Sequence, residues 1–266
     1  MFLTQFAHDV FNNIHIAWTF ILLIVRFTGF FTVVPGLGEG VRGIMLRMPA
    51  VMVLAFTSLR PDTYAAMPLD FLSMFFQMLC EYLFGMLIGI IPLFLLAGVQ
   101  MAAQLASTSM GLGASQLIDP TTGGNVSDLA RLCGDLTIIF FLMIGGDHVA
   151  IYAVSGVAGD TLVGSFVPSS FTAEFLINRS AHIFYVGALL ASPVIVALLL
   201  TQFVMGLVTK AVPTVNIFII SFPLTIGIGL TLSVLALPDM MVFVRKEITG
   251  LESAFVLLLR DTVSVR

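Results

Sequence analysis

Long apolar segments, each ended by Gly, Pro or a short polar stretch, follow one another along the whole chain. They fall at Ile14–Val34, Ile44–Leu59, Phe71–Val99, Leu129–Val157, Ala181–Thr209 and Thr214–Leu237. A helix of about 20 apolar residues spans about 30 Å of hydrocarbon, so the pattern predicts six hydrophobic helices. The second segment is marginal as a span, because it is short and contains Arg47 and Pro49.

Three prolines interrupt the last two apolar segments. Pro193 and Pro223 lie inside the segments, and Pro213 lies between them. A proline inside a helix frees a carbonyl group that lipid cannot satisfy. We therefore predict helix hinges at these three positions, with neighbouring protein or water covering the freed carbonyls.

Beyond Pro238 the pattern becomes amphipathic. Apolar residues recur at alternating spacings of three and four, at Val244, Ile248, Leu251, Phe255 and Leu258. The spacing predicts an amphipathic helix that lies on a bilayer surface or on a sister subunit, or that has a specific docking role. The basic residues of this tail favour a cytoplasmic C-terminus.

Composition places the chain in the membrane class. Hydrophobic residues make up 59% of its 266 residues, charged residues only 10%, and the mean hydropathy is +1.09. A net charge of -4 without a basic stripe argues against nucleic-acid binding. Cys80 and Cys133 have no metal-ligand spacing and are expected to be small buried hydrophobes. The N-terminal residues lack the features of a cleaved signal peptide, so we expect them to be retained.

A few ionisable residues stand inside the apolar segments, namely Arg26, Glu81 and the pair Asp147-His148. An ionised group at the bilayer centre costs on the order of 3 kcal/mol, so these side chains should face protein, water or each other. Glu81 is either a proton or ion site or a structural hydrogen-bond acceptor. The Asp-His pair follows two glycines and is either a helix break capped by the carboxylate or a proton relay.

Two helix faces carry small or polar residues. Glu81, Gly85 and Gly89 are spaced four apart and form a face where another backbone can approach closely. Gln100 and Gln104, with Ser107, continue the third apolar segment as a polar stripe that a lipid-facing helix would not carry. Both faces predict contacts with other helices.

The stripe leads into a glycine-bounded segment, MGLGASQLIDPTTGGN, which begins with Met110, Gly111, Leu112 and Gly113. The glycines make this segment flexible, and Met110 supplies one large, deformable side chain. The composition fits either a constriction or movable plug in a pore, or an ordinary interhelical loop.

No enzyme motif is present. The glycines between Gly36 and Gly40 lack the lysine and serine of a phosphate loop, and they link two apolar segments rather than a strand to a helix. The chain has no GxSxG and no HExxH motif. We therefore predict no catalytic residue, no cofactor and no metal ligand.

Several of these stretches together resemble the FliR family, the flagellar members of the export-gate proteins that also include the T-type subunit of injectisome type III secretion systems. The resemblance covers the chain from Arg26 to about Leu237. It rests on Arg26 with Gly29 and Pro35, Glu81-xxx-Gly85-xxx-Gly89, Met110-Gly111 followed by Ile118-Asp119-Pro120, Gly146-x-His148, Pro193 to Pro213, and Phe222-Pro223-Leu224-Thr225.

The resemblance implies a subunit of the export gate in the bacterial inner membrane and the flagellar basal body. Its partners would be FliP-type and FliQ-type subunits, the FlhB-type and FlhA-type gate components, unfolded flagellar substrates and membrane lipid. The family's plug loop maps onto residues 110–124, which include Asp119 and Pro120. The family often has Pro-Gln where this chain has Pro213-Thr214, so the hinge is carried over but not a glutamine contact.

The predicted fold is all-α, a hydrophobic multi-helix membrane-associated protein with kinked helices. The resemblance divides it into a P-like region, residues 1–178, and a Q-like helical hairpin with the amphipathic C-terminal helix, residues 179–266. The predicted function is a structural subunit of the pore through which unfolded flagellar substrates enter the export conduit. The alternative is a small secondary transporter, which would use intramembrane carboxylates such as Glu81, Asp135 and Asp147.

Overall fold

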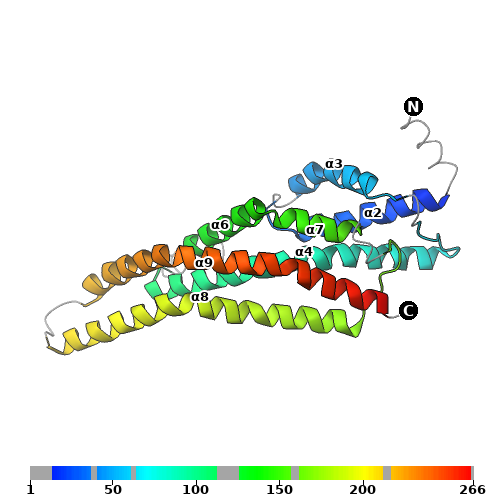
Figure 1. Cartoon of the computed structure of the whole chain (residues 1–266). Coiled ribbons are helices and arrows are strands. Elements are labelled where there is room, and N and C mark those ends of the chain that lie inside the picture. The colour runs from blue at the N-terminus through cyan, green and yellow to red at the C-terminus, as the bar shows by residue number, and fades with distance from the viewer. Residues whose placement is uncertain are drawn as a thin grey trace. The chain divides into compact units, whose positions relative to one another are not determined.

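Seven helices and no strand make up the part of the chain that the structure describes. This computed structural model describes residues 14–36, 41–60, 64–112, 126–156, 162–211 and 217–264. The helices, labelled in Figure 1, are α2 (Ile14–Val33), α3 (Val41–Thr57), α4 (Phe71–Met110), α6 (Asp128–Ile144), α7 (Gly146–Ser155), α8 (Ser170–Ala211) and α9 (Ile217–Ser264). The predicted all-α fold class is confirmed.

Within these residues, four helices are long and apolar enough to cross a membrane. They are α2, α4, α8 and the Ile219–Leu251 part of α9, and the bent pair α6 and α7 makes a fifth if it is counted as one span. The apolar part of α3, Arg47–Thr57, is shorter. The second apolar segment is therefore too short for a conventional span, as its length predicted.

The helices run further than the apolar segments. Helix α4 continues beyond Val99 through the polar stripe, and α9 continues through Pro238 into the C-terminal tail. Four of the five residues of the predicted amphipathic stripe are buried: Val244, Ile248 and Phe255 are each 3% exposed or less, and Leu251 is 4% exposed. The chain itself covers this face, so the expectation that a bilayer surface or a sister subunit would cover it was wrong.

The chain folds into two compact units that interleave in sequence. The first unit comprises residues 1–93, 142–178 and 248–266, and the second comprises residues 94–141 and 179–247. The two units are defined by contacts within the chain, and these contacts do not reveal whether a region resembles a P-type or a Q-type subunit. The P-like and Q-like division at residue 178 therefore stays a prediction.

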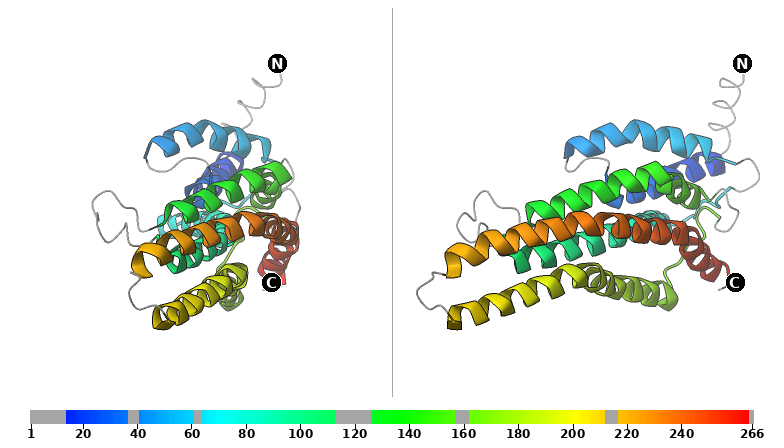
Figure 2. Two further views of the ribbon diagram at one scale, coloured as in Figure 1. Left: turned by 90° about the vertical axis from the view of Figure 1, so that its left-hand side faces the viewer. Right: turned by 60° about the vertical axis from the view of Figure 1, so that its left-hand side comes forward.

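The core of the first unit forms around α2. This helix contacts α3, which lies beside it in Figure 2, and also α7. The aromatic side chains of Phe27, Phe30 and Phe84 are almost fully buried. The ring of Phe84 also packs on Phe166, with 5.1 Å between the ring centroids.

The second unit contains the antiparallel hairpin of α8 and α9, and the end of α4 lies between these two helices in the right-hand view of Figure 2. The hairpin packs on the end of α4, where Ala106, Met110, Val194 and Leu198 form a buried cluster. Much of the hairpin's apolar surface stays exposed. Only 28% of the most apolar stretch of α8 and 11% of that of α9 is buried, against 61% for α4.

Candidate functional site

The end of α4, where the predicted plug segment begins, is anchored to α9. The Met110 side chain is 1% exposed and occupies a notch at Gly229. A Cβ atom added at Gly229 would lie 2.8 Å from both Sδ and Cε of Met110, so only a glycine leaves room for this side chain. Met110 is therefore held by the hairpin of its own chain.

Two further contacts fix the same end of α4. The Thr225 hydroxyl donates a hydrogen bond to the Met110 carbonyl at 3.2 Å. Gly111 has a φ of +88° and lies against the Phe222 ring, which an added Cβ would approach to 3.2 Å. A positive φ together with this close ring requires glycine here, and it ends α4. The backbone N–H of Leu112 bonds the Ser107 carbonyl at 3.1 Å and closes the turn.

The remaining predicted plug residues, Gly113, Asp119 and Pro120, lie outside the described residues. The chain is described again from Val126. There the backbone N–H of Ser127 donates a hydrogen bond to Oε1 of Gln104 at 2.8 Å. Both flanks of the segment 113–125 are thus tied to the last turns of α4.

The polar stripe of α4 contacts α6. Gln104 makes the hydrogen bond just described, and the Gln100 side chain packs on Gly134, where an added Cβ would lie 3.0 Å from Cγ of Gln100. Ser107 is fully buried, and its hydroxyl has no hydrogen-bond partner in the described part of the chain. The stripe therefore faces protein within the second unit.

In the first unit, Arg26 and Glu81 form a fully buried ion pair. Nε of Arg26 donates to Oε2 of Glu81 at 2.5 Å, and both side chains are at most 1% exposed. The Arg26 guanidinium also lies over the Phe84 ring, 4.4 Å from its centroid, and Nη1 bonds the Val154 carbonyl at 3.3 Å. The other Glu81 oxygen accepts the backbone N–H of Gly164 at 2.7 Å.

This ion pair joins four segments of the first unit: α2, α4, α7 and the stretch before α8. The sequence indicated that Arg26 and Glu81 each needed a partner, but it missed the contributions of Val154 and Gly164. For Gly164, the residue type itself was the sign in the sequence of a special backbone position. Its φ in the structure is +82°, a conformation that favours glycine. Glu81 therefore accepts hydrogen bonds that hold the first unit together, and the positive charge of Arg26 balances its negative charge.

Beside the ion pair, glycines let α2 and α4 approach each other closely. A Cβ at Gly85 would overlap the Arg26 carbonyl and lie 2.9 Å from the backbone nitrogen of Phe30. A Cβ at Gly89 would lie 2.9 Å from the Phe30 carbonyl oxygen, and one at Gly29 would overlap the Tyr82 carbonyl. Gly85 and Gly89 thus lie where two helix backbones meet.

The Gly145 region breaks the fourth apolar segment into α6 and α7. Gly145 has a φ of +82°, and no side chain caps the first turn of α7. The carboxylate cap predicted for Asp147 is absent. Instead, Oδ1 of Asp147 lies 3.0 Å from Nδ1 of His148, whose side chain is 84% exposed. The carbonyl of Gly145 accepts the backbone N–H of His148 at 3.1 Å.

The prolines predicted as hinges lie in different settings. Pro193 is inside α8, and the carbonyl that it frees, that of Leu189, accepts a hydrogen bond from the Ser192 hydroxyl at 2.8 Å. The helix covers this carbonyl itself, so the expected neighbouring protein or water is not needed there. Pro223 is inside α9, and Pro213 lies outside the described residues.

The described ionisable side chains do not gather into a reactive centre. No group of three His, Cys, Asp or Glu among the described residues could hold a metal ion. Cys133 is buried and Cys80 is only half-buried, and both are free thiols. The prediction that Cys80 is a buried hydrophobe was therefore only partly right.

Replacing Gly229 by alanine should destabilise the protein by about 1 to 2 kcal/mol, because the added Cβ displaces the Met110 side chain from its notch. In a Met110→Ala background the same change should be neutral or slightly stabilising. Thermal unfolding of the four proteins of this cycle measures the coupling. Gly227→Ala is the control, since a Cβ there meets nothing within 4 Å. Equal effects of Gly229→Ala in both backgrounds would show that the Met110 side chain is not held at Gly229.

Comparison with known proteins gives a consistent result. Residues 17–251 match the family described as bacterial export proteins, family 1. The chain is 23% identical over 239 residues to the flagellar biosynthetic protein FliR of Bacillus subtilis, which covers 85% of this chain and 88% of that protein.

Two further relatives cover similar lengths. The flagellar biosynthetic protein FliR of Aquifex aeolicus is 26% identical over 224 residues, 83% of this chain and 85% of the relative. The Yop proteins translocation protein T of Yersinia pestis is 24% identical over 253 residues, 93% of each chain. The similarity thus extends to proteins of both flagellar biosynthesis and Yop translocation.

Proposed function

Because the chain belongs to the bacterial export proteins of family 1, the family of the FliR proteins, we propose that it is a structural subunit of a type III protein export gate. In this proposal it lines part of the pore through which unfolded flagellar substrates enter the conduit. The observation that carries the proposal is the match over residues 17–251, which includes segments of both compact units.

The chain is a membrane protein of the bacterial inner membrane, with four described helices apolar enough to span it. Two of these helices, α8 and α9, have most of their apolar surface uncovered by the chain itself. We assign this surface to packing against FliP-type and FliQ-type subunits of the flagellar basal body. The hairpin then acts as the Q-like part of the subunit.

Residues 110–124 form the plug in this proposal. A movable plug needs firm attachments on both sides, and such attachments are present at Met110 and at Ser127. The segment between them contains Asp119 and Pro120. FlhB-type and FlhA-type gate components would be further partners of the subunit, which itself would catalyse no bond chemistry.

The rival hypothesis is a small secondary transporter, and the carboxylates it needs are in unfavourable settings. Glu81 is engaged by Arg26 and by the Gly164 backbone, so it has no free oxygen for a transported ion. Asp147 pairs with an exposed histidine, and Asp135 is itself exposed. A transporter should show substrate-dependent flux when reconstituted alone in liposomes, whereas the gate subunit should show none.

Shortening the segment between Gly111 and Gly124 should produce a pore that leaks small ions. The reason is that a plug of reduced length no longer fills the constriction. The measurement is membrane conductance or dye leakage in cells that express the deletion variant with its FliP-type and FliQ-type partners. A variant with the same number of residues replaced by Gly and Ser is the control for length. Unchanged leakage across a series of deletions that still assemble would remove the plug assignment.

A further inference from the structure

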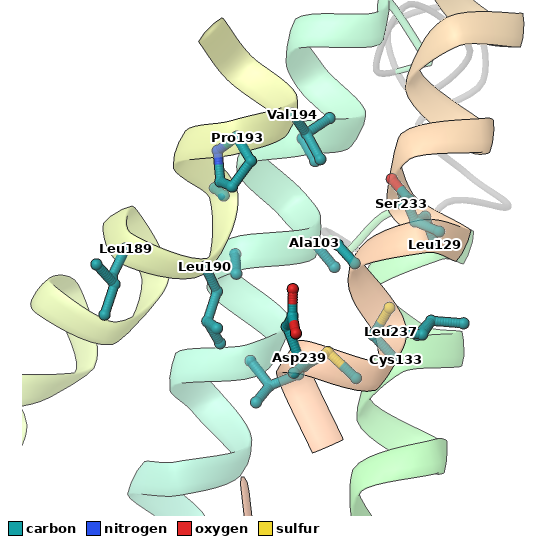
Figure 3. A pocket seen from close by; sticks show the side chains of 16 residues that line it. Ala103, Leu129, Cys133, Leu189, Leu190, Pro193, Val194, Ser233, Leu237 and Asp239 are labelled. Atoms are coloured by element: carbon teal, nitrogen blue, oxygen red, sulfur yellow. The ribbon is translucent and has the colours of Figure 1, made fainter. Parts of the chain in front are cut away.

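The second unit contains an apolar pocket whose only charged group is a carboxylate. The pocket has a volume of about 190 Å³ and is lined by α4, α6, α8 and α9. Figure 3 shows Asp239 of α9 with its carboxylate directed into the space between Leu190 and Ala103. The proposed function does not use this pocket.

Asp239 has no partner within the described part of the chain. None of the ion pairs involves this side chain, and neither does any hydrogen bond. The residue is exposed, although it lies inside the Ile219–Leu251 stretch that is apolar enough to span a membrane. Ionisable groups in such stretches face protein or a water-filled cavity, and they often pair with another charge, because desolvating a lone charge is unfavourable. The described part of the chain supplies no counter-charge for Asp239, so an occupant of the pocket would have to bring one.

A second polar atom in the pocket is also unsatisfied. The Ser233 hydroxyl is buried and has no hydrogen-bond partner in the described residues. Ser233 and Asp239 both line the pocket. An occupant that carries hydrogen-bond donors on a cationic group would satisfy the hydroxyl and the carboxylate together.

The size and the lining of the pocket define the occupant further. A cavity of about 150 Å³ holds a molecule as large as benzene, so about 190 Å³ holds one long side chain. Apolar residues such as Leu190, Val194 and Leu237 suit an aliphatic stem, and Asp239 suits a cationic tip. Lysine and arginine combine these two features. A lipid acyl chain would fill the apolar part but leave the carboxylate unpaired.

We propose that this pocket is the docking site for a lysine or arginine side chain on an apolar helix of another subunit. The site lies beside the exposed surface of the α8–α9 hairpin, where a neighbouring helix has access to it. The inference rests on the proposed function only in that the neighbour is taken to be a partner subunit of the export gate.

The test uses the chain co-expressed with its FliP-type and FliQ-type partners, with a photo-reactive amino acid in place of Leu190. We expect a cross-link to a partner helix at a residue within one helical turn of a lysine or arginine. Asp239→Lys should reduce this cross-link about tenfold or more, because two like charges then face each other. Changing the mapped basic residue of the partner to glutamate should restore it.

Controls separate loss of docking from loss of folding. Asp135→Asn removes another exposed carboxylate, from α6, and should leave the cross-link unchanged. Ala236→Leu fills the pocket without changing its charge and should also reduce the cross-link. A cross-link to lipid, to a segment without a basic residue, or to nothing would overturn the inference, as would an undiminished cross-link in Asp239→Lys. Failure of the unmodified chain to co-purify with these partners would instead contradict the proposed function.

Discussion

Replacing Gly85 by alanine should prevent the first unit from folding stably. A Cβ at this position overlaps the backbone carbonyl of Arg26, and backbone in a helix cannot rotate away as a side chain can. Overpacking costs about 1 to 3 kcal/mol where side chains can adjust, so we expect a loss of about 3 kcal/mol or more here. The measurement is the amount of monodisperse protein extracted in mild detergent, together with its thermal unfolding.

Three other helical glycines provide matched controls for this substitution. A Cβ at Gly206, Gly227 or Gly250 would meet nothing within 4 Å. Alanine at these positions should be neutral or should stabilise the helix by up to about 1 kcal/mol. If Gly85→Ala behaves like these controls, the close crossing of α2 and α4 is wrong.

Breaking the ion pair between Arg26 and Glu81 should have a comparably large effect. Glu81→Gln keeps the shape of the side chain but leaves the buried Arg26 guanidinium without its counter-charge. Removing one partner of a buried pair costs about 3 to 5 kcal/mol. We expect the single variants Glu81→Gln and Arg26→Met to accumulate poorly and to unfold at much lower temperature than the unmodified protein.

The double variant distinguishes pairing from a general loss of packing. Arg26→Met combined with Glu81→Gln removes both charges and keeps most of the side-chain volume, so it should recover a large part of the loss. Asp135→Asn is the control for loss of a carboxylate in general, because Asp135 is exposed. A double variant that loses as much as the sum of the two single variants would show that the two charges do not interact.

The helices could be predicted from the sequence because their signal is local. All six apolar segments became helices, and the breaks at Gly111 and Gly145 occur at glycines with positive φ. The extension of α9 through Pro238 could not be foreseen, since it depends on tertiary burial of the tail. Pro193 could have been better interpreted, because Ser192 next to it can reach the freed carbonyl locally.

Contacts between residues that are distant in the sequence were harder to predict from the sequence. The sequence indicated that the charges of Arg26 and Glu81 needed partners and that Gly85 permitted close approach, but the common location of these residues depends on how α2 crosses α4. The contribution of Gly164 comes from a backbone N–H, which any residue type has. Asp239 was overlooked because it lies just after the sixth apolar segment.

We expect other subunits to cover the apolar surface of the α8–α9 hairpin, which the chain itself leaves exposed. The decisive experiment is native mass spectrometry of the chain co-expressed with its FliP-type and FliQ-type partners and released from mild detergent. We expect the chain to be detected in a complex that contains both partner types. Detection of the chain as a stable, monodisperse monomer beside a complex that lacks it would show that no other subunit covers this surface.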